Sequence, residues 1–261
     1  MALDAGEDRL AARRWSDPDH RPTGDDVVVV HGFAQSGACL GPMGPAIAEQ
    51  HPLVAVDAPG HGGSARHARA DLWRGADLLV GTGGVGTYVG YSMGGRLALH
   101  AALRSPELVQ RLVLISCTAG IEDERQRADR VAWDEQHASR LEEIGLEAFI
   151  EEWLAQPLFA DLPSWARFDD ERRANTVEGL AASLRHAGTG SMEPLWDRLG
   201  SIACPVLVLT GSRDERFGEL GARMAATIGS NARHVVVPGA GHSTHLERPS
   251  ETTVALLDFL A

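Results

Sequence analysis

Ser92 stands in the run GYSMG at residues 90–94, which has the pattern G-x-S-x-G. The pattern is typical of a tight turn from a strand into a helix. Flanking glycines avoid collisions there, and the serine hydroxyl is pushed out at the carboxyl edge of a sheet. An apolar run precedes the turn at 86–91, and a helical pattern follows it at 94–103. We therefore predict that Ser92 is a reactive hydroxyl.

A reactive serine needs a histidine and an acid that orients the histidine, with the expected chain order serine, acid, histidine. Asp214 follows an apolar run at 206–209, and His242 follows another at 234–237. Both runs are typical of strands, and open α/β sheets place their sites at the carboxyl ends of strands. These positions predict a triad of Ser92, Asp214 and His242.

The negative charge that develops in reactions of such a triad is stabilised by two backbone N–H donors, the oxyanion hole. We predict that one donor is the amide of Met93, next to the serine. The second is predicted to be the amide of Phe33, in a loop where Gly32 allows a close approach of the backbone.

Three further histidines lie near these segments. His245 could replace His242 as the base, but the Gly-x-Gly-His context favours His242. For His31 and His61, which lie in loops close to the expected strand ends, a role in ordering the loop is favoured over acid–base chemistry.

The elements that must position these residues are short apolar runs, typical of strands buried on both faces. They cover residues 27–30, 53–56, 86–91, 112–115, 206–209 and 234–237. Helical segments separate several of them, so the alternation predicts a mostly parallel, doubly wound α/β sheet. The glycine-rich stretch at 81–86 precedes a strand, whereas a dinucleotide fingerprint follows one, so we reject nucleotide binding there.

The alternation stops between Gly120 and Pro194, where helices are expected over 128–144 and 146–154, with one or two more over 169–186. We predict a helical lid at 120–195, inserted in a core formed by 1–119 and 196–261.

Composition limits the function classes. The length of 261 residues suits one large domain with an insertion. The formal net charge of −12 argues against nucleic acid or an anionic membrane as a partner, although a small anionic substrate is compatible with it. The chain has no lysine, so all 24 basic side chains are arginines, and an arginine cluster is a weaker sign of an anion site than usual.

Cys39, Cys117 and Cys204 are too scattered for a disulfide framework or a zinc site. Residues 1–14 lack the apolar segment of a signal peptide, and no apolar run approaches the roughly 20 residues that span a bilayer. We expect a cytoplasmic protein; its oligomeric state is not predicted.

Several short runs of the sequence resemble motifs of known protein families. The runs HGF at 31–33, DAPGHGGS at 57–64 and GYSMGG at 90–95 are typical of the α/β-hydrolase fold at large. More discriminating runs are ERQR at 124–127, EWLAQPLF at 152–159, GTGSMEPLW at 188–196, GSRDERF at 211–217 and GHSTHLERP at 241–249. Together they resemble the 2-succinyl-6-hydroxy-2,4-cyclohexadiene-1-carboxylate (SHCHC) synthases of menaquinone biosynthesis, over nearly the whole chain from Val27 onward.

The resemblance implies elimination of pyruvate from 2-succinyl-5-enolpyruvyl-6-hydroxy-3-cyclohexene-1-carboxylate, with no metal and no organic cofactor. This substrate carries three carboxylates, so fixed cations are expected in its pocket, and arginine suits a carboxylate best. The substrate-binding residues implied by the resemblance are Tyr91, Arg96, Arg125, Trp153 and Arg172.

Two of these assignments have neighbouring alternatives, Arg127 for Arg125 and Arg173 for Arg172. The chain also departs from the family pattern, because the loop at 34–41 lacks an aromatic residue near Leu40 and extra residues lie around 163–165.

Three functions are compared. In a lyase, Ser92 takes a ring proton and the enolate is held by the oxyanion hole. In a serine hydrolase (an esterase or a carbon–carbon-bond hydrolase), Ser92 forms an acyl-enzyme that water resolves. The triad serves both, and only the arginines and the resemblance favour the lyase. A non-catalytic binding protein of this fold is disfavoured because no triad member is missing.

Overall fold

The computed structural model describes residues 2–15 and 25–261. These residues contain one eight-stranded sheet in the order β1-β2-β4-β3-β5-β6-β7-β8. Its strands are β1 (Ala2–Leu3), β2 (Ala12–Trp15), β3 (Val27–Val30), β4 (Leu53–Val56), β5 (Gly86–Tyr91), β6 (Val109–Ile115), β7 (Val206–Gly211) and β8 (Ala232–Val237).

The α-helices are α1 (Met43–Ala48), α2 (Leu72–Gly83), α3 (Met93–Arg104), α4 (Glu124–Ile144), α5 (Leu146–Leu154), α6 (Asp169–Arg173), α7 (Val177–Ala187), α8 (Glu215–Ile228), α9 (Thr244–Glu247) and α10 (Pro249–Leu260). Short 3₁₀ helices are η1 (Gly62–His67), η2 (Pro157–Phe159), η3 (Ser164–Arg167) and η4 (Trp196–Ser201).

Strands β3 to β8 are parallel, as the alternation predicts, and each contains one of the six apolar runs. The antiparallel strands β1 and β2 at the sheet edge were not predicted. Strand β2 reads ARRW, and two arginines in four residues give no apolar signal. Its pairing with β4 supplies the order that its own sequence does not indicate.

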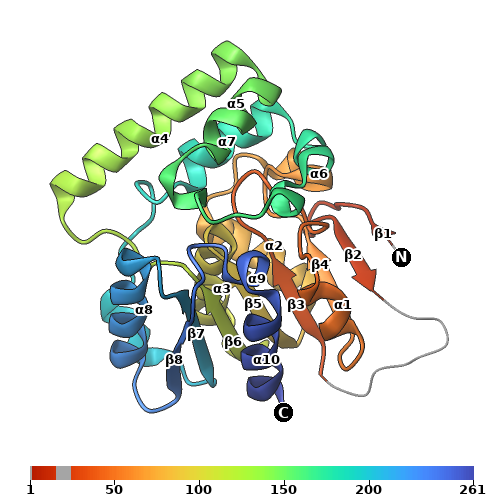
Figure 1. The fold of residues 1–261 in the computed structure, drawn as a ribbon, viewed down its shortest axis with the longest axis vertical. Coiled ribbons are helices and arrows are strands. Elements are labelled where there is room, and N and C mark those ends of the chain that lie inside the picture. The colour runs from red at the N-terminus through yellow and green to blue at the C-terminus, as the bar shows by residue number, and fades with distance from the viewer. Residues whose placement is uncertain (1, 16–24) are drawn as a thin grey trace.

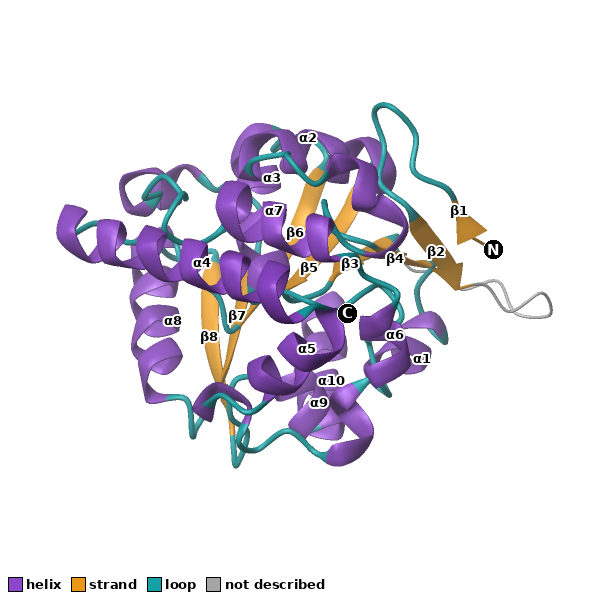
Figure 2. Cartoon of the chain, turned by 90° about the horizontal axis from the view of Figure 1, so that it is seen from above, coloured by secondary structure: helices purple, strands orange, loops and turns teal. Residues whose placement is uncertain are grey.

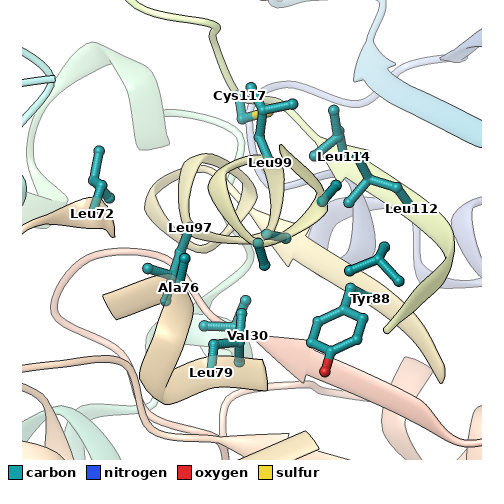
Figure 3. Packing of buried hydrophobic residues seen from close by; sticks show 14 of the residues in the cluster. Val30, Leu72, Ala76, Leu79, Tyr88, Leu97, Leu99, Leu112, Leu114 and Cys117 are labelled. Atoms are coloured by element: carbon teal, nitrogen blue, oxygen red, sulfur yellow. The ribbon is translucent and has the colours of Figure 1, made fainter. Parts of the chain in front are cut away.

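The parallel strands are buried on both faces because successive side chains point to opposite sides of a sheet. On one face Val28 and Val30 belong to an apolar cluster that also contains side chains of α2, α3 and α8, and part of this cluster is drawn in Figure 3. On the other face Val27 and Val29 pack with side chains of α1 and α10. Two helical layers therefore hold the sheet rigid behind the loops at its carboxyl edge.

The chain leaves the sheet after β6 and returns at β7, and residues 116–205 form a helical insertion. Its helices α4 to α7 gather at one end of the molecule in Figure 1, and α4, α5 and α7 lie over the strands when seen from above in Figure 2. The insertion has its own apolar cluster, which includes Leu141, Phe149 and Leu184 and reaches Ala34 of the core. Gly145, at φ 79°, separates α4 from α5 at the break that the sequence predicts.

Candidate active site

Ser92 occupies the turn between β5 and α3 in a strained conformation, with φ 51° and ψ −108°. Its amide donates to the carbonyl of Ile115 at 2.8 Å, which fixes the turn to the neighbouring strand β6. A Cβ at Gly90 would collide with the carbonyl of Gly94, and a Cβ at Gly94 would collide with the carbonyl of Val30. Glycine is therefore required on both sides of Ser92, as the motif predicts.

Ser92, His242 and Asp214 form a continuous hydrogen-bonded chain. The Oγ of Ser92 lies 3.1 Å from Nε2 of His242, and Nδ1 of His242 lies 2.7 Å from Oδ2 of Asp214. The three residues come from the carboxyl ends of β5, β8 and β7. The geometry is that of a serine whose proton can pass to an oriented imidazole.

The loop that carries His242 is held by the carboxylate of Glu247. This carboxylate accepts hydrogen bonds from the amides of Gly241 and Ser243, on either side of the histidine. His245, the alternative base, is buried against the ring of Tyr91 at a centroid distance of 4.6 Å. Burial lowers the pKa of His245 to about 3, so it stays neutral.

His31 and His61 order the loops after β3 and β4. Nε2 of His61 accepts the amide of Ala34 at 3.1 Å, and Nε2 of His31 accepts the amide of Ala58 at 3.0 Å. Burial lowers the pKa of His31 to about 4 and that of His61 to about 3, so both rings are neutral and can accept through Nε2. This arrangement agrees with the structural role predicted for both residues.

The amides of Phe33 and Met93 are the two donors that the sequence predicts for an oxyanion. Within residues 2–15 and 25–261, neither amide donates to another protein group. The first amides of a helix have no intrahelical partner, and Met93 is the first residue of α3. Both residues line the cavity that contains Ser92 and His242.

This cavity has a volume of about 1090 Å³ and lies between the core and the helical insertion. Tyr91, Ser92 and His242 line it from the core, and Trp153 lines it from the insertion. The Tyr91 hydroxyl forms a hydrogen bond with Oγ of Ser243 at 2.6 Å, and burial raises the pKa of Tyr91. Trp153 packs edge-on against Phe33 at 4.8 Å, and its indole nitrogen is buried without a described partner.

Arg96 and Arg172, two of the predicted anion-binding residues, both line the cavity and are buried. Nη1 of Arg96 donates to the carbonyl of Ala187 at 2.6 Å, and Nη1 of Arg172 donates to that of Ala34 at 3.0 Å. Burial lowers the pKa of Arg96 to about 10 and also lowers the pKa of Arg172. Among the described ion pairs neither guanidinium has a carboxylate partner, so each keeps N–H donors for a ligand.

Arg125 was predicted to bind the substrate, but it does not line the cavity. Its side chain is exposed on α4, and Arg127, the alternative, donates to Ile121 at 3.4 Å and also lies outside the lining. Arg130 lines the cavity instead. The difference is one of helical phase, because Arg130 shares the cavity-facing side of α4 with Gln126, Asp129 and Trp133.

The choice between Arg172 and Arg173 is clear in the structure. Arg173 is exposed and paired with Glu147 and Asp170. Arg172, its sequence neighbour, is buried in the cavity wall.

Sequence reasoning missed several residues that line the cavity. They are Gln35, Arg130, Trp133, Phe159 and Phe217. Phe217 packs edge-on against the imidazole of His242 at 4.5 Å. Helix α4 is polar almost all round and has little apolar periodicity, so its sequence does not show which side faces the cavity, and Phe159 and Phe217 are likewise placed only by tertiary packing.

Comparison with known proteins identifies the family. An "alpha/beta hydrolase family" model matches residues 27–256. The 2-succinyl-6-hydroxy-2,4-cyclohexadiene-1-carboxylate synthase of Escherichia coli O157:H7 is 34% identical over 250 residues, which cover 90% of this chain and 93% of that protein. The synthase of Serratia proteamaculans (strain 568) is 31% identical over 217 residues, covering 80% of this chain and 83% of that protein. The chain belongs to the α/β-hydrolase family and, within it, to the SHCHC synthases.

Solved structures agree with membership of the SHCHC synthases. MenH from S. aureus superposes with a TM-score of 0.83 at 28% identity, over 95% of this chain and 97% of that one. A thermophilic esterase from Thermogutta terrifontis, only 23% identical, shares the fold with a TM-score of 0.79. The fold therefore does not by itself choose a reaction.

In this SHCHC synthase family member, no group of three or more His, Cys, Asp or Glu side chains in the described ranges is placed to hold a metal ion. No helix there is long and apolar enough to cross a membrane. Cys39, Cys117 and Cys204 are free thiols.

Proposed function

We propose that this protein is a lyase that eliminates pyruvate from 2-succinyl-5-enolpyruvyl-6-hydroxy-3-cyclohexene-1-carboxylate to give SHCHC. The observation that carries the proposal is the pair of buried guanidiniums, Arg96 and Arg172, which line the cavity beside Ser92 without a described carboxylate partner. Such cations suit a substrate with three carboxylates. The SHCHC synthases among the relatives support the same reaction.

Ser92, His242 and Asp214 would act as a triad. Asp214 holds the imidazole so that Nδ1 carries a proton and Nε2 is free to accept the proton of Ser92. The Ser92 oxygen then takes the ring proton next to the succinyl ketone. No covalent intermediate between the enzyme and the substrate is required.

The electron pair of the broken C–H bond would first form an enolate on the ketone oxygen, stabilised by the amides of Phe33 and Met93. Collapse of the enolate then forms a double bond between C2 and C3 of the ring, moves the existing C3–C4 double bond to C4–C5, and breaks the bond between C5 and the enolpyruvyl oxygen. That group leaves as the enolate of pyruvate and takes up a proton. Arg96 and Arg172 would hold the carboxylates in place throughout, with Tyr91 and Trp153 as further contacts.

We also propose that the helical insertion is a lid, with the boundaries 120 and 195 expected from the sequence. Its side chains Trp153 and Arg172 form one wall of the cavity, so its closure would keep water from the enolate. The substrate would be a small polycarboxylate in the cytoplasm.

The test is to supply the purified protein with the enolpyruvyl substrate and to follow pyruvate release, with a p-nitrophenyl ester assayed in parallel. We expect pyruvate release that Ser92→Ala abolishes, and little ester turnover. Ester turnover without pyruvate release would favour a serine hydrolase, because the triad geometry serves both chemistries.

A further inference from the structure

Asp134 is a buried carboxylate on α4 in the wall of the cavity, and its side chain is only 4% exposed. Oδ1 accepts a hydrogen bond from Nε of Arg130 at 2.9 Å, and Oδ2 accepts one from the amide of Gly190 at 3.1 Å. A Cβ at Gly188 would collide with the same carboxylate. Asp134 therefore joins the helix to the loop at 188–190, which follows α7.

Arg130 is oriented by its own helix. Its guanidinium carbon lies 4.5 Å from the ring centroid of Trp133, and its Nε is engaged by Asp134. Its two terminal nitrogens donate to no residue in the described part of the chain. A guanidinium fixed through Nε and by ring stacking presents the remaining edge for a ligand carboxylate.

Ala187, the last residue of α7 and adjacent to this loop, also holds Arg96, because its carbonyl accepts a hydrogen bond from Nη1 of Arg96. Burial lowers the pKa of Arg96, the charge of Arg130 lowers it further, and the charge of Asp134 raises it, so the three groups lie close enough to interact. Asp134 thus contacts Arg130 directly and supports the loop beside Ala187, which anchors Arg96.

We propose that Asp134 is a positioning residue for substrate recognition, which holds the Arg130 guanidinium in the cavity wall to receive a carboxylate of the substrate. The proposal rests on the proposed function for the identity of the substrate. The arrangement in which Arg130 lies between the carboxylate of Asp134 and a carboxylate of the ligand requires only that the ligand is an anion.

A double-mutant cycle tests the coupling between the two residues. We expect Asp134→Ala and Arg130→Ala each to raise KM for the enolpyruvyl substrate by about 10-fold or more, because a charge-assisted hydrogen bond contributes on the order of 10- to 100-fold in affinity. In the Arg130→Ala background, Asp134→Ala should raise KM by a smaller factor than in the wild type, since only the support of the loop beside Arg96 is then lost. We expect kcat to stay within about 3-fold, since binding is lost equally from the ground state and the transition state.

Removing Asp134 also adds net positive charge, which attracts any anion, so the measurements use about 0.3 M salt to screen that effect. Asp134→Asn keeps an oxygen that can accept one of the two hydrogen bonds, and we expect a smaller rise in KM of about 3- to 10-fold. Glu143→Gln is the matched control on α4, because it breaks the exposed pair with Arg140 and should leave KM unchanged.

A second readout does not depend on turnover. The dissociation constant of citrate, a tricarboxylate, is measured by titration calorimetry on the same variants and should follow the same pattern. Absence of pyruvate release by the wild type would overturn the proposed reaction and leave the citrate cycle to decide the role of Asp134. The inference is overturned if the two substitutions act independently, if Asp134→Ala leaves the citrate affinity unchanged, or if the wild type does not bind citrate.

Discussion

Arg172 and Arg173 are adjacent in the chain and have opposite surroundings. Arg172 is 2% exposed in the cavity wall, whereas Arg173 is exposed and forms ion pairs with Glu147 and Asp170. Exposed ion pairs contribute little to stability. Arg172→Gln should therefore raise KM for the enolpyruvyl substrate by about 10- to 100-fold, and Arg173→Gln should leave it unchanged.

Steady-state kinetics of both variants, with their thermal midpoints as a check of folding, measure this difference. Equal KM values for Arg172→Gln and the wild type would remove Arg172 from the substrate site. A rise for Arg173→Gln would place the anion site on the outer surface of the insertion.

At the scale of single residues, the sequence predicted some site positions and misplaced others. The hydrogen-bonded arrangement of Ser92, Asp214 and His242 was predictable, because each residue follows an apolar strand and Ser92 lies between required glycines. Arg125 was misplaced because the side chains that face the cavity are selected by the rotation of α4. Tertiary contacts with residues far away in the sequence fix that rotation, among them the hydrogen bond of Asp134 with Gly190 and the apolar cluster that Leu141 shares with Leu184.

At the scale of elements, the loop that carries Phe33 is held by the loop after the neighbouring strand. His61 accepts the amide of Ala34 from the start of η1. His61→Ala removes this acceptor, so the adjacent amide of Phe33 is no longer held in a fixed position. Since an oxyanion donor acts mainly in the transition state, we expect kcat to fall by about 10- to 100-fold with little change in KM.

The matched control is His67→Ala. His67 lies in the same η1 segment, but its Nε2 contacts the carbonyl of Gly6, away from the cavity. It should keep the kcat of the wild type. If His61→Ala kept full kcat as well, the loop after β4 would have no part in placing the oxyanion hole.

The elements themselves were predictable where burial makes the sequence apolar. All six parallel strands follow from short β-branched runs, and α5 is found at the residues expected. Helix α4 starts earlier than expected, at Glu124, because Asp123 caps it by accepting the amide of Gln126 at 2.8 Å. Strand β2 was missed because its order comes from its partner β4.

At the scale of the whole molecule, charge is separated between the surface and the site. The chain has a formal net charge of −12, yet the cavity holds buried arginines without described carboxylate partners. Other arginines of the insertion, such as Arg140 and Arg185, form exposed pairs with glutamates. The number of arginines could not distinguish these two groups, because the distinction lies in burial, which requires the fold.

Four buried histidines make the stability of the whole molecule sensitive to acid. Burial lowers the pKa of His31 and His100 to about 4 and of His61 and His245 to about 3. In the unfolded chain each returns to about 6.5. Below pH 6.5 the unfolded state therefore binds more protons, and the stabilisation present above that pH is lost as the pH falls toward 4.

Four such groups together lower the free energy of unfolding by about 5 kcal/mol per pH unit between pH 6 and 4. Calorimetric unfolding at pH 5.5, in buffers of different ionisation enthalpy, should show an uptake of about three to four protons. His100→Gln, at a histidine that is 1% exposed, should reduce the uptake by about one proton. An uptake near zero, or an unfolding free energy that is flat between pH 6 and 4, would mean that these histidines are already charged in the folded protein.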